Sequence, residues 1–116
     1  MGGYTGAYVV TADRITFSTS TTAANTASNL STARGELPMG VSDKITYGYI
    51  LDGYSGTTAV NIADRITFST SVGAAATASN STVNKGSGAS VSDGSTYGYC
   101  LGGFSGGGTK VTESEE

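Results

Sequence analysis

Two stretches of this chain are identical: Ala12-Asp13-Arg14-Ile15-Thr16-Phe17-Ser18-Thr19-Ser20 and, 51 residues later, Ala63-Asp64-Arg65-Ile66-Thr67-Phe68-Ser69-Thr70-Ser71. The sequence around them also repeats, at an offset of 50 or 51, in four further places: 26–29 with 77–80, 41–43 with 91–93, 46–49 with 96–99, and 3–6 with 53–56 and 103–106. The one-residue changes of offset fall in expected loops. The chain is therefore built from a repeat of about 50 residues.

The identical stretch is predicted to be a β-strand. In the second copy every second residue from Val60 to Phe68 is apolar except Asp64, and Ile15 and Phe17 follow the same pattern in the first copy. This alternation is the period of a strand with one face turned inward. The identical stretch therefore predicts one inward-facing strand in each copy.

Turn signals divide each repeat into about four strands. A strand is expected over 46–51 and again over 96–101, and Asp93-Gly94 is a strong hairpin signal that joins the latter to a short strand ending near Val91. The small, polar stretch 74–79 suits a short outer strand. No segment has the 3.6-residue apolar period of a helix.

Four strands in about 50 residues match the size of one β-propeller blade. We therefore predict an all-β propeller with about two four-stranded blades in each chain. Blades pack sheet against sheet, so both faces of each sheet are buried. Gly48 and Gly98 lie on the Tyr-rich strands, and we expect them to leave room for a bulky neighbour.

The composition indicates that one chain alone is a poor domain. Gly, Thr and Ser make up 52 of the 116 residues, whereas Leu, Ile, Val and Phe make up only 20. Disordered chains are also poor in apolar residues, but they carry a high net charge. This chain has a net charge of −3 and contains seven Tyr and three Phe. We therefore expect a folded chain whose core is too thin for an isolated domain.

Several functional classes are disfavoured. The chain has six Lys and Arg and nine Asp and Glu, so it lacks the excess of positive charge with which proteins bind nucleic acid. No apolar run approaches a membrane span, and no signal peptide is recognisable. His is absent and Cys100 is the only cysteine, which removes most metal sites and the His-dependent nucleophilic mechanisms. We predict no metal, no cofactor and no enzymatic activity.

The repeat resembles the kelch type. Kelch repeats have an Arg-containing segment before a short strand, then a hairpin, then a Tyr-containing strand that ends in Gly-Gly. In this chain 31–34 resembles the Arg segment, and 47–53 and 97–103 resemble the Tyr strand with its diglycine end. Gly2-Gly3 is similar to the diglycine end of a further repeat.

The chain departs from the kelch pattern at three points: it has no Trp, Asp52 replaces one glycine, and Asn84-Lys85 replace the Arg of the second copy. Its shorter motif, with Tyr-Gly-Tyr and Asp-Arg-Ile-Thr-Phe, is similar to kelch-like repeats of phage and environmental virus proteins. The resemblance covers essentially the whole chain. It implies a β-propeller and says little about function.

The phase of the repeat predicts how the blades are divided. Residues 37–80 are expected to form one complete blade. An N-terminal half-blade with its connecting loop is expected over 1–36, and a C-terminal half-blade over 81–112. An acidic tail, 113–116, follows and is expected to be disordered. Each half-blade leaves an open strand edge, which is a template for another chain.

Propellers have about four to eight blades, so we expect copies of this chain to complete one another. The C-terminal half-blade of one copy would pair head-to-tail with the N-terminal half-blade of the next, which closes a ring if the rotation fits. Three copies would give six blades and four would give eight, and we favour the homotrimer. The alternative is a piece of a longer propeller, although the Met1 start and the acidic tail favour a complete chain.

Repeated charges are the first candidate sites. Asp13-Arg14 and Asp64-Arg65 lie on the alternating strands, and the two Asp share the inward face with the apolar residues. A buried carboxylate must be hydrogen-bonded or paired. We interpret these residues as contacts from blade to blade. The alternative is a ring of acids around the channel that binds a cation or another ligand.

Repeated aromatic residues are the second candidate site. Tyr4, Tyr54 and Phe104 follow the glycine turns. Aromatic faces stack on sugars, so with Asp52 and nearby hydroxyls they would form a repeated, shallow glycan site. The alternative, which we favour, is packing between adjacent blades.

The remaining features are interpreted as structural. Cys100 takes the place of Ile50 and is expected to be a small buried hydrophobe. The glycine-rich stretch 106–110 is expected to be a turn, because it lacks the spacing of a phosphate-binding loop. We interpret the residues that break the repeat as drift in a solvated loop, with a partner surface as the alternative; they are Arg34, Glu36, Pro38 and Met39, against Asn84, Lys85, Gly88 and Ala89.

These predictions describe a non-catalytic, self-assembling propeller that binds a partner, either a glycan or a protein at a cell or virion surface. The alternative is a purely structural virion or assembly subunit without a small-molecule ligand. An enzyme that uses channel carboxylates is the least favoured hypothesis. Neither nucleic acid nor membrane insertion is expected.

Overall fold

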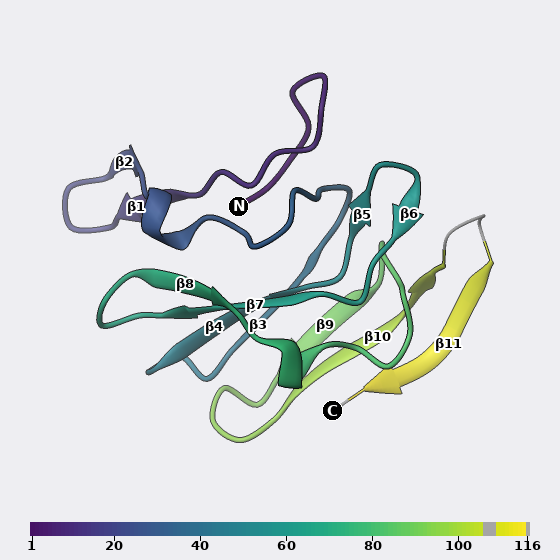
Figure 1. The fold of residues 1–116 in the computed structure, drawn as a ribbon. Coiled ribbons are helices and arrows are strands. Elements are labelled where there is room, and N and C mark those ends of the chain that lie inside the picture. The colour runs from purple at the N-terminus through teal and green to yellow at the C-terminus, as the bar shows by residue number, and fades with distance from the viewer. Residues whose placement is uncertain (106–108, 116) are drawn as a thin grey trace.

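The computed structural model describes residues 1–105 and 109–115. These residues form eleven strands and two short 3-10 turns, and the strands make four antiparallel sheets, none of them closed (Figure 1). The predicted all-β class is confirmed. Residues 106–108 and 116, which include part of the expected glycine turn and the end of the acidic tail, lie outside the described residues.

The central sheet contains four strands, β3 (Met39–Ser42), β4 (Tyr47–Leu51), β7 (Ala63–Thr67) and β8 (Val72–Ala75), in that spatial order. Every neighbouring pair is antiparallel. The sheet lies within the segment 37–80. Its strands β4 and β7 coincide with the stretches in which apolar residues alternate, as the period of the sequence predicts.

The N-terminal sheet repeats half of the central sheet. It consists of β1 (Asp13–Thr16) and β2 (Thr21–Ala24), which pair as β7 and β8 do. Asp13 lies opposite Ala24, just as Asp64 lies opposite Ala75. The identical sequence stretches therefore pair in the same register. The prediction of an inward-facing strand is nevertheless wrong for the first copy, because in the described part of the chain no second sheet packs on the face of β1 that carries Ile15 and Phe17, which are exposed.

The C-terminal sheet contains the other half and one additional strand. It consists of β9 (Ala89–Ser92), β10 (Gly98–Phe104) and β11 (Lys110–Glu115), in that spatial order. Strands β9 and β10 pair as β3 and β4 do. The expectation of a disordered tail is wrong for residues 113–115, which belong to β11. Acidic composition indicates solvation, but strand pairing uses backbone N–H and C=O groups, which every residue here supplies.

A small hairpin joins β4 to β7. It consists of β5 (Tyr54–Ser55) and β6 (Thr58–Ala59), two strands too short to show an alternating pattern. The same turn is present in the first copy as a single bridge between Tyr4 and Tyr8. The unit therefore contains a fifth element that the four-strand prediction omits.

The prediction of an outer strand over 74–79 is confirmed only at the start of that range. β8 ends at Ala75, and the residues that follow form a 3-10 turn, η2 (Thr77–Ser79). The Ser79 N–H donates to the Ala76 carbonyl (2.8 Å), which closes the turn. The first copy has the matching turn, η1 (Thr26–Ser28).

Aspartates fix the hairpins of the central and C-terminal sheets. Asp43 Oδ1 accepts hydrogen bonds from three backbone N–H groups, and the bond from Tyr47 (2.8 Å) does most to lower the pKa of this carboxyl. Asp93 Oδ1 is bonded in the same way, and the bond from Ser95 (2.7 Å) does most to lower its pKa. Such bonds stabilise the ionised carboxylate. The hairpin turn predicted at Asp93-Gly94 is confirmed, and Asp43 holds the equivalent turn of the central sheet.

The hydrophobic core is small and lies between the central and C-terminal sheets. It contains one side chain each from β3, β4, β7 and β10, and Cys100 is buried within it as expected. The buried members are Met39, Leu51, Ala63 and Cys100, and Val41, Tyr49 and Ala76 pack against them.

Serine hydroxyls join the two sheets beside this core. Ser90 Oγ donates to the Gly40 carbonyl (2.8 Å), and Ser92 Oγ donates to the Ser42 carbonyl (2.8 Å). Each bond connects positions 50 residues apart, so equivalent strands of successive repeats lie side by side. Hydrogen bonds from small polar residues thus help to hold the two sheets together, as apolar contacts do in a larger core.

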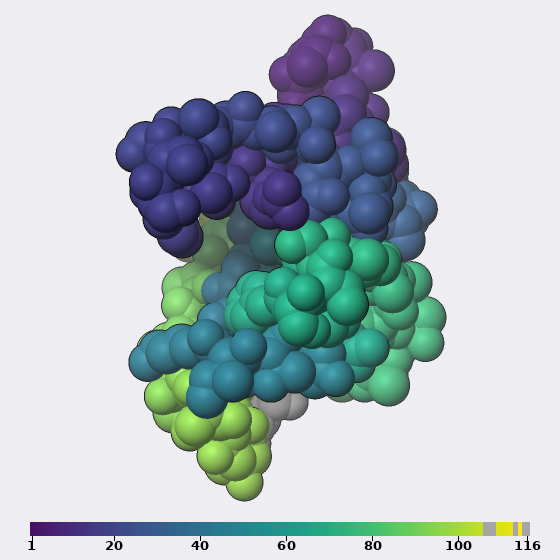
Figure 2. Space-filling model, turned by 90° about the vertical axis from the view of Figure 1, so that its left-hand side faces the viewer, coloured from purple at the N-terminus to yellow at the C-terminus, as the bar shows by residue number. Residues whose placement is uncertain are grey.

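The residues that follow β2 contact the turn between β7 and β8 of the central sheet. Ser28 Oγ and Asn25 Nδ2 both donate to the Ser71 carbonyl, at 2.6 and 3.1 Å. Gly73 of β8 lies close to the Ser28 backbone, because a Cβ at Gly73 would lie 3.0 Å from Ser28 Cα. Figure 2 shows the N-terminal part (purple and blue) as a separate layer above the central sheet (teal).

Candidate functional site at the turns and edges of the sheets

Asp64 forms a buried ion pair with Arg34. Arg34 Nη1 lies 2.8 Å from Asp64 Oδ2, and both side chains are almost completely excluded from solvent. The Ser31 N–H donates to both carboxylate oxygens, at 3.2 and 3.1 Å, and Arg34 Nη2 donates to the Ile50 carbonyl (3.0 Å). The pair therefore fixes the segment before β3 against β4 and β7, a structural role within the chain.

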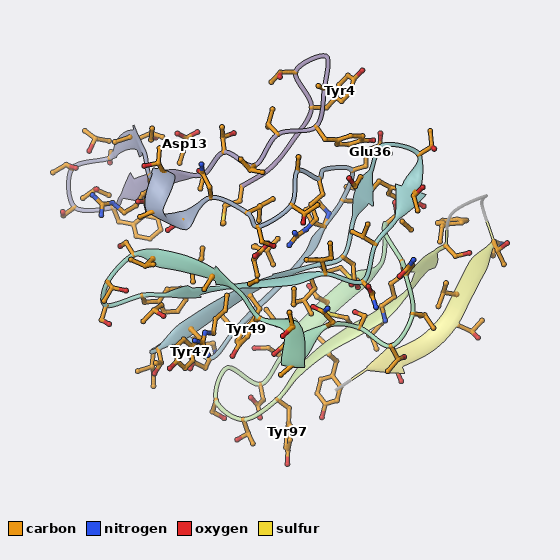
Figure 3. All side chains as sticks on the ribbon, in the orientation of Figure 1. Tyr4, Asp13, Glu36, Tyr47, Tyr49 and Tyr97 are labelled. Atoms are coloured by element: carbon orange, nitrogen blue, oxygen red, sulfur yellow. The ribbon has the colours of Figure 1, made fainter. Side chains whose placement is uncertain are left out.

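Asp13 has the same sequence context as Asp64 but a different environment. Its side chain is exposed on β1, and Arg14 beside it is exposed as well (Figure 3). Asp64 is held by Arg34 and by the Ser31 N–H, which lie 30 and 33 positions earlier in the chain. The same local sequence thus gives a buried, paired carboxylate in one copy and an exposed carboxylate in the other.

Lys85 occupies the position of Arg34 in the second repeat. Gly35 bridges to Tyr54, and Gly86 bridges to Phe104, so the basic residue before each glycine is equivalent. Both basic side chains are buried.

The interpretation of the residues that break the repeat as drift in a solvated loop is wrong for Arg34 and Lys85. It is also wrong for the core residue Met39, because all three side chains are buried. The backbone bridges align Arg34 with Lys85 rather than with Asn84. The sequence signal that finds this alignment is a basic residue directly before glycine, at an offset of 51.

Asp52 lies inside the fold, away from the surface position proposed for a sugar site. Its side chain is completely buried, and Ser81 Oγ lies 2.8 Å from each of its carboxylate oxygens. Its φ of +58° matches that of Gly102, the equivalent residue of the next repeat, at +57°. The structure thus separates Asp52 from the exposed aromatic turns.

Tyr4 stands at the tip of the N-terminal turn, with 66% of its surface exposed. Its ring meets Tyr8 edge to face at 5.4 Å, and the Tyr8 hydroxyl donates to Glu36 Oε1 (2.6 Å). This hydrogen bond raises the pKa of Tyr8 to about 12. In Figure 3, Tyr4 and Glu36 lie at the same end of the molecule.

Tyr54 and Phe104 lie together at that end of the fold. The Tyr54 hydroxyl donates to the Phe104 carbonyl (3.3 Å), and Phe104 is partly exposed. The Tyr54 ring covers Gly86 so closely that a Cβ there would lie 2.5 Å from Tyr54 Cε2. The contact supports packing between successive repeats for Tyr54, whereas Tyr4 keeps a free face.

Gly48 and Gly98 lie where neighbouring groups come close. A Cβ at Gly48 would lie 3.0 Å from Phe68 Cε1, and a Cβ at Gly98 would lie 2.9 Å from Val41 Cγ2. Both positions leave room for a bulky side chain, as their sequence context suggests. Arg65 stacks on the ring of Tyr47 at 4.4 Å, so it too makes a structural contact.

A groove follows the boundary between the central and C-terminal sheets. A hollow of about 270 Å³ is lined by Tyr49, Ser79, Ser81, Gly98 and Cys100, among others. A second hollow of about 180 Å³ shares Tyr49 and Gly98 and adds Ser95, Thr96 and Tyr97. The lining combines tyrosines and hydroxyls with apolar side chains such as Val41 and Leu51, and the repeat pattern alone does not reveal it.

The described residues contain no cluster of three or more Cys, Asp or Glu that could hold a metal ion. Within the same residues, no helix is long and apolar enough to cross a membrane. No protein-family model matches the chain, and no curated protein matches it.

Proposed function

We propose that this chain is a subunit of a kelch-like β-propeller that assembles head-to-tail from identical copies and serves as a non-catalytic binding module. One observation carries the proposal: the flanking sheets are complementary halves of the central sheet. Strands β9 and β10 repeat β3 and β4, and strands β1 and β2 repeat β7 and β8. Joined in the order β9-β10-β1-β2, two copies would reproduce the four-stranded sheet.

The side chains at the proposed joint match a contact already made within the central sheet. There the Phe68 ring covers Gly48. The equivalent residues at the ends of the chain are Phe17, which is 90% exposed, and Gly98. A second copy would bring Phe17 to β10 beside Gly98 and the Val41 side chain that packs on it, and would remove this aromatic ring from water, which is favourable.

Two further contacts would be repeated at the joint. Arg65 stacks on Tyr47 within the central sheet, and Arg14 would reach the exposed Tyr97 in the same way. Asp13 would face the Lys85 segment as Asp64 faces Arg34. Because each contact has a counterpart inside the chain, the joint needs no new type of interaction.

The stoichiometry follows from two four-stranded units in each copy. Propellers of about four to eight blades correspond to two, three or four copies. We propose the trimer with six blades.

The test replaces the exposed ring at the joint. We expect Phe17→Ser to abolish assembly in native mass spectrometry, because the ring has no role inside the single chain. Ile45→Ser is the matched control, since Ile45 is also highly exposed but lies in the β3-β4 turn. Wild-type chain that remains a monomer at every concentration would refute the proposal, and so would full assembly of Phe17→Ser.

For the binding role, the proposed ligand is a glycan or a surface protein that meets the aromatic turns. The support is the 66% exposed ring of Tyr4, repeated in every copy of a ring. A glycan array comparing wild type with Tyr4→Ala tests it, and we expect binding that the variant loses. Assembled protein that binds no sugar would favour the purely structural role.

A further inference from the structure

Strand β11 occupies on β10 the position that β7 occupies on β4. Ser114 lies opposite Leu101, just as Ala63 lies opposite Leu51, and both pairs of strands are antiparallel. In Figure 1, β11 forms the outer strand of the C-terminal sheet. At Cys100 and Leu101, β11 therefore takes the place that the third strand has in the central sheet.

The next register position also matches. Glu115 lies opposite Cys100, where the central sheet has Asp64 opposite Ile50. Asp13 is the residue of β1 that is equivalent to Asp64. An acidic residue thus stands at the same register position in β11, β7 and β1.

The assembly proposed above brings β1 of a second copy to this same edge of β10. A strand edge has one row of N–H and C=O groups, so it pairs with one strand at a time. We infer, on the basis of the proposed function, that β11 is an internal substitute for β1 of a second copy. It covers the end of the assembly edge, at Cys100 and Leu101, in the single chain and must leave these residues when copies join.

The two strands differ in how much of the edge they can use. β11 pairs with Cys100, Leu101, Gly103 and Phe104, and its register shifts between Leu101 and Gly103. In the central sheet β7 pairs with five consecutive residues of β4 without a shift. Since β1 has the sequence of β7, an arriving β1 would form the unshifted ladder. The exchange therefore replaces an irregular pairing with a regular one.

The arriving strand also brings side-chain contacts of the kind that the central sheet makes. It carries Phe17 toward Gly98 and Arg14 toward Tyr97, as in the central sheet. Covering the edge in the single chain blocks unspecific pairing with other strands. Assembly then proceeds by strand exchange, and the stability of β11 sets the concentration at which it begins.

A reversible crosslink in the full chain tests the inference. Leu101→Cys with Ser114→Cys, in a Cys100→Ala background, places a cysteine pair directly opposite each other across β10 and β11. We expect the oxidised protein to stay monomeric and the same sample to assemble after reduction, as read by native mass spectrometry. Thr67→Cys with Val72→Cys in the same background is the matched control, because it crosslinks the β7-β8 hairpin away from the edge.

The possible outcomes separate this inference from the proposed function. If oxidised and reduced samples assemble equally, β11 stays on β10 in the assembly and the inference is wrong, while self-assembly stands. If the wild type and the reduced variant are both monomeric, assembly itself fails, and the inference fails with it.

Glu115→Pro provides a second test without cysteines. Asp93 N–H donates to the Tyr97 carbonyl, so alternate residues of β10, including Cys100 opposite Glu115, turn their backbone groups toward β11. Proline at position 115 removes a backbone N–H that faces β10, and losing one hydrogen bond of ordinary strength corresponds to about a five-fold change in an equilibrium constant. We expect the midpoint concentration of assembly to fall by about that factor. A midpoint that rises would contradict the inference.

Discussion

Asp13 and Asp64 show how position in the fold, rather than sequence, determines the role of a residue. They lie in identical nine-residue stretches, yet Asp64 is paired with Arg34 at 2.8 Å and Asp13 is exposed. A buried ion pair contributes little net stability when both partners are present, but removing one partner leaves an uncompensated buried charge. The two aspartates are therefore a matched pair for mutation.

We expect Asp64→Asn to lower the free energy of unfolding by about 3 kcal/mol. We expect Asp13→Asn to change it by no more than about 0.5 kcal/mol. Both are measured by urea unfolding in a Phe17→Ser background, which keeps the copies separate. Equal losses from the two variants would show that the Arg34 contact does not stabilise the chain.

The hairpin aspartates predict a pH dependence of stability. Backbone hydrogen bonds lower the pKa of Asp43 and Asp93 in the folded chain below the ordinary value of 3.8. The stability that they contribute is therefore fully present above that ordinary value, and it is lost as the pH falls through the lowered folded pKa.

We expect the free energy of unfolding to fall less steeply between about pH 5 and pH 2 in the Asp43→Asn, Asp93→Asn double variant than in the wild type. Urea titrations at several pH values measure the two slopes. A double variant with the same slope as the wild type would mean that these carboxylates titrate alike in the folded and unfolded chain.

At the scale of elements, the close approach of β3 to β10 depends on a missing side chain. A Cβ at Gly98 would lie 2.9 Å from Val41 Cγ2, and Val41 is a β-branched residue with little freedom to move. Gly40 is the matched control on β3, because the nearest atom to its Cβ position is 3.7 Å away. The two glycines thus differ in the space around them.

We expect Gly98→Ala to lower the free energy of unfolding by about 1–3 kcal/mol, the cost of overpacking. Gly40→Ala should stay within about 0.5 kcal/mol of the wild type. Both are measured by urea unfolding in the Phe17→Ser background. If Gly98→Ala left the free energy of unfolding unchanged, the two sheets could move apart there without a loss of stability.

The strands that the sequence predicts are those whose side chains carry the pattern. Alternating apolar residues identify β4 and β7, and Asp93-Gly94 identifies the turn between β9 and β10. The hairpin β5-β6 is missed because strands of two residues have no period. The sequence does not predict β11, because its pairing depends on backbone hydrogen bonds, which the amino-acid composition does not indicate.

The candidate site was predicted less completely than the strands, for a related reason. The parity of Asp64 with apolar residues predicts an inward position, but the same parity does not bury Asp13, and the partner Arg34 lies 30 residues away in an irregular segment. Asp52 follows a strand and precedes glycine, which suggested a surface turn, yet it is buried beside Ser81. Contacts between irregular segments depend on tertiary packing, which local periodicity cannot show.

At the scale of the whole molecule, the thin core and the exposed apolar groups have a common explanation. The buried cluster joins the central sheet to the C-terminal sheet. Large exposed apolar side chains, meanwhile, lie on or beside both flanking sheets. They include Ile15 and Phe17 on the N-terminal side, and Val91, Tyr97 and Leu101 on the C-terminal side. Burial that one chain lacks would be supplied by its neighbours in the proposed ring.

If neighbours supply this burial, the stability of the fold depends on protein concentration. Assembly favours the folded chain by mass action, and for a trimer a hundred-fold rise in concentration adds somewhat less than 2 kcal/mol per chain. We expect the thermal midpoint of the wild type to rise by roughly 5 to 10 °C over that range, and the midpoint of Phe17→Ser to stay constant. Differential scanning fluorimetry at the two concentrations measures both. A wild-type midpoint independent of concentration would mean that the 20 Leu, Ile, Val and Phe side chains of a single chain suffice for its stability.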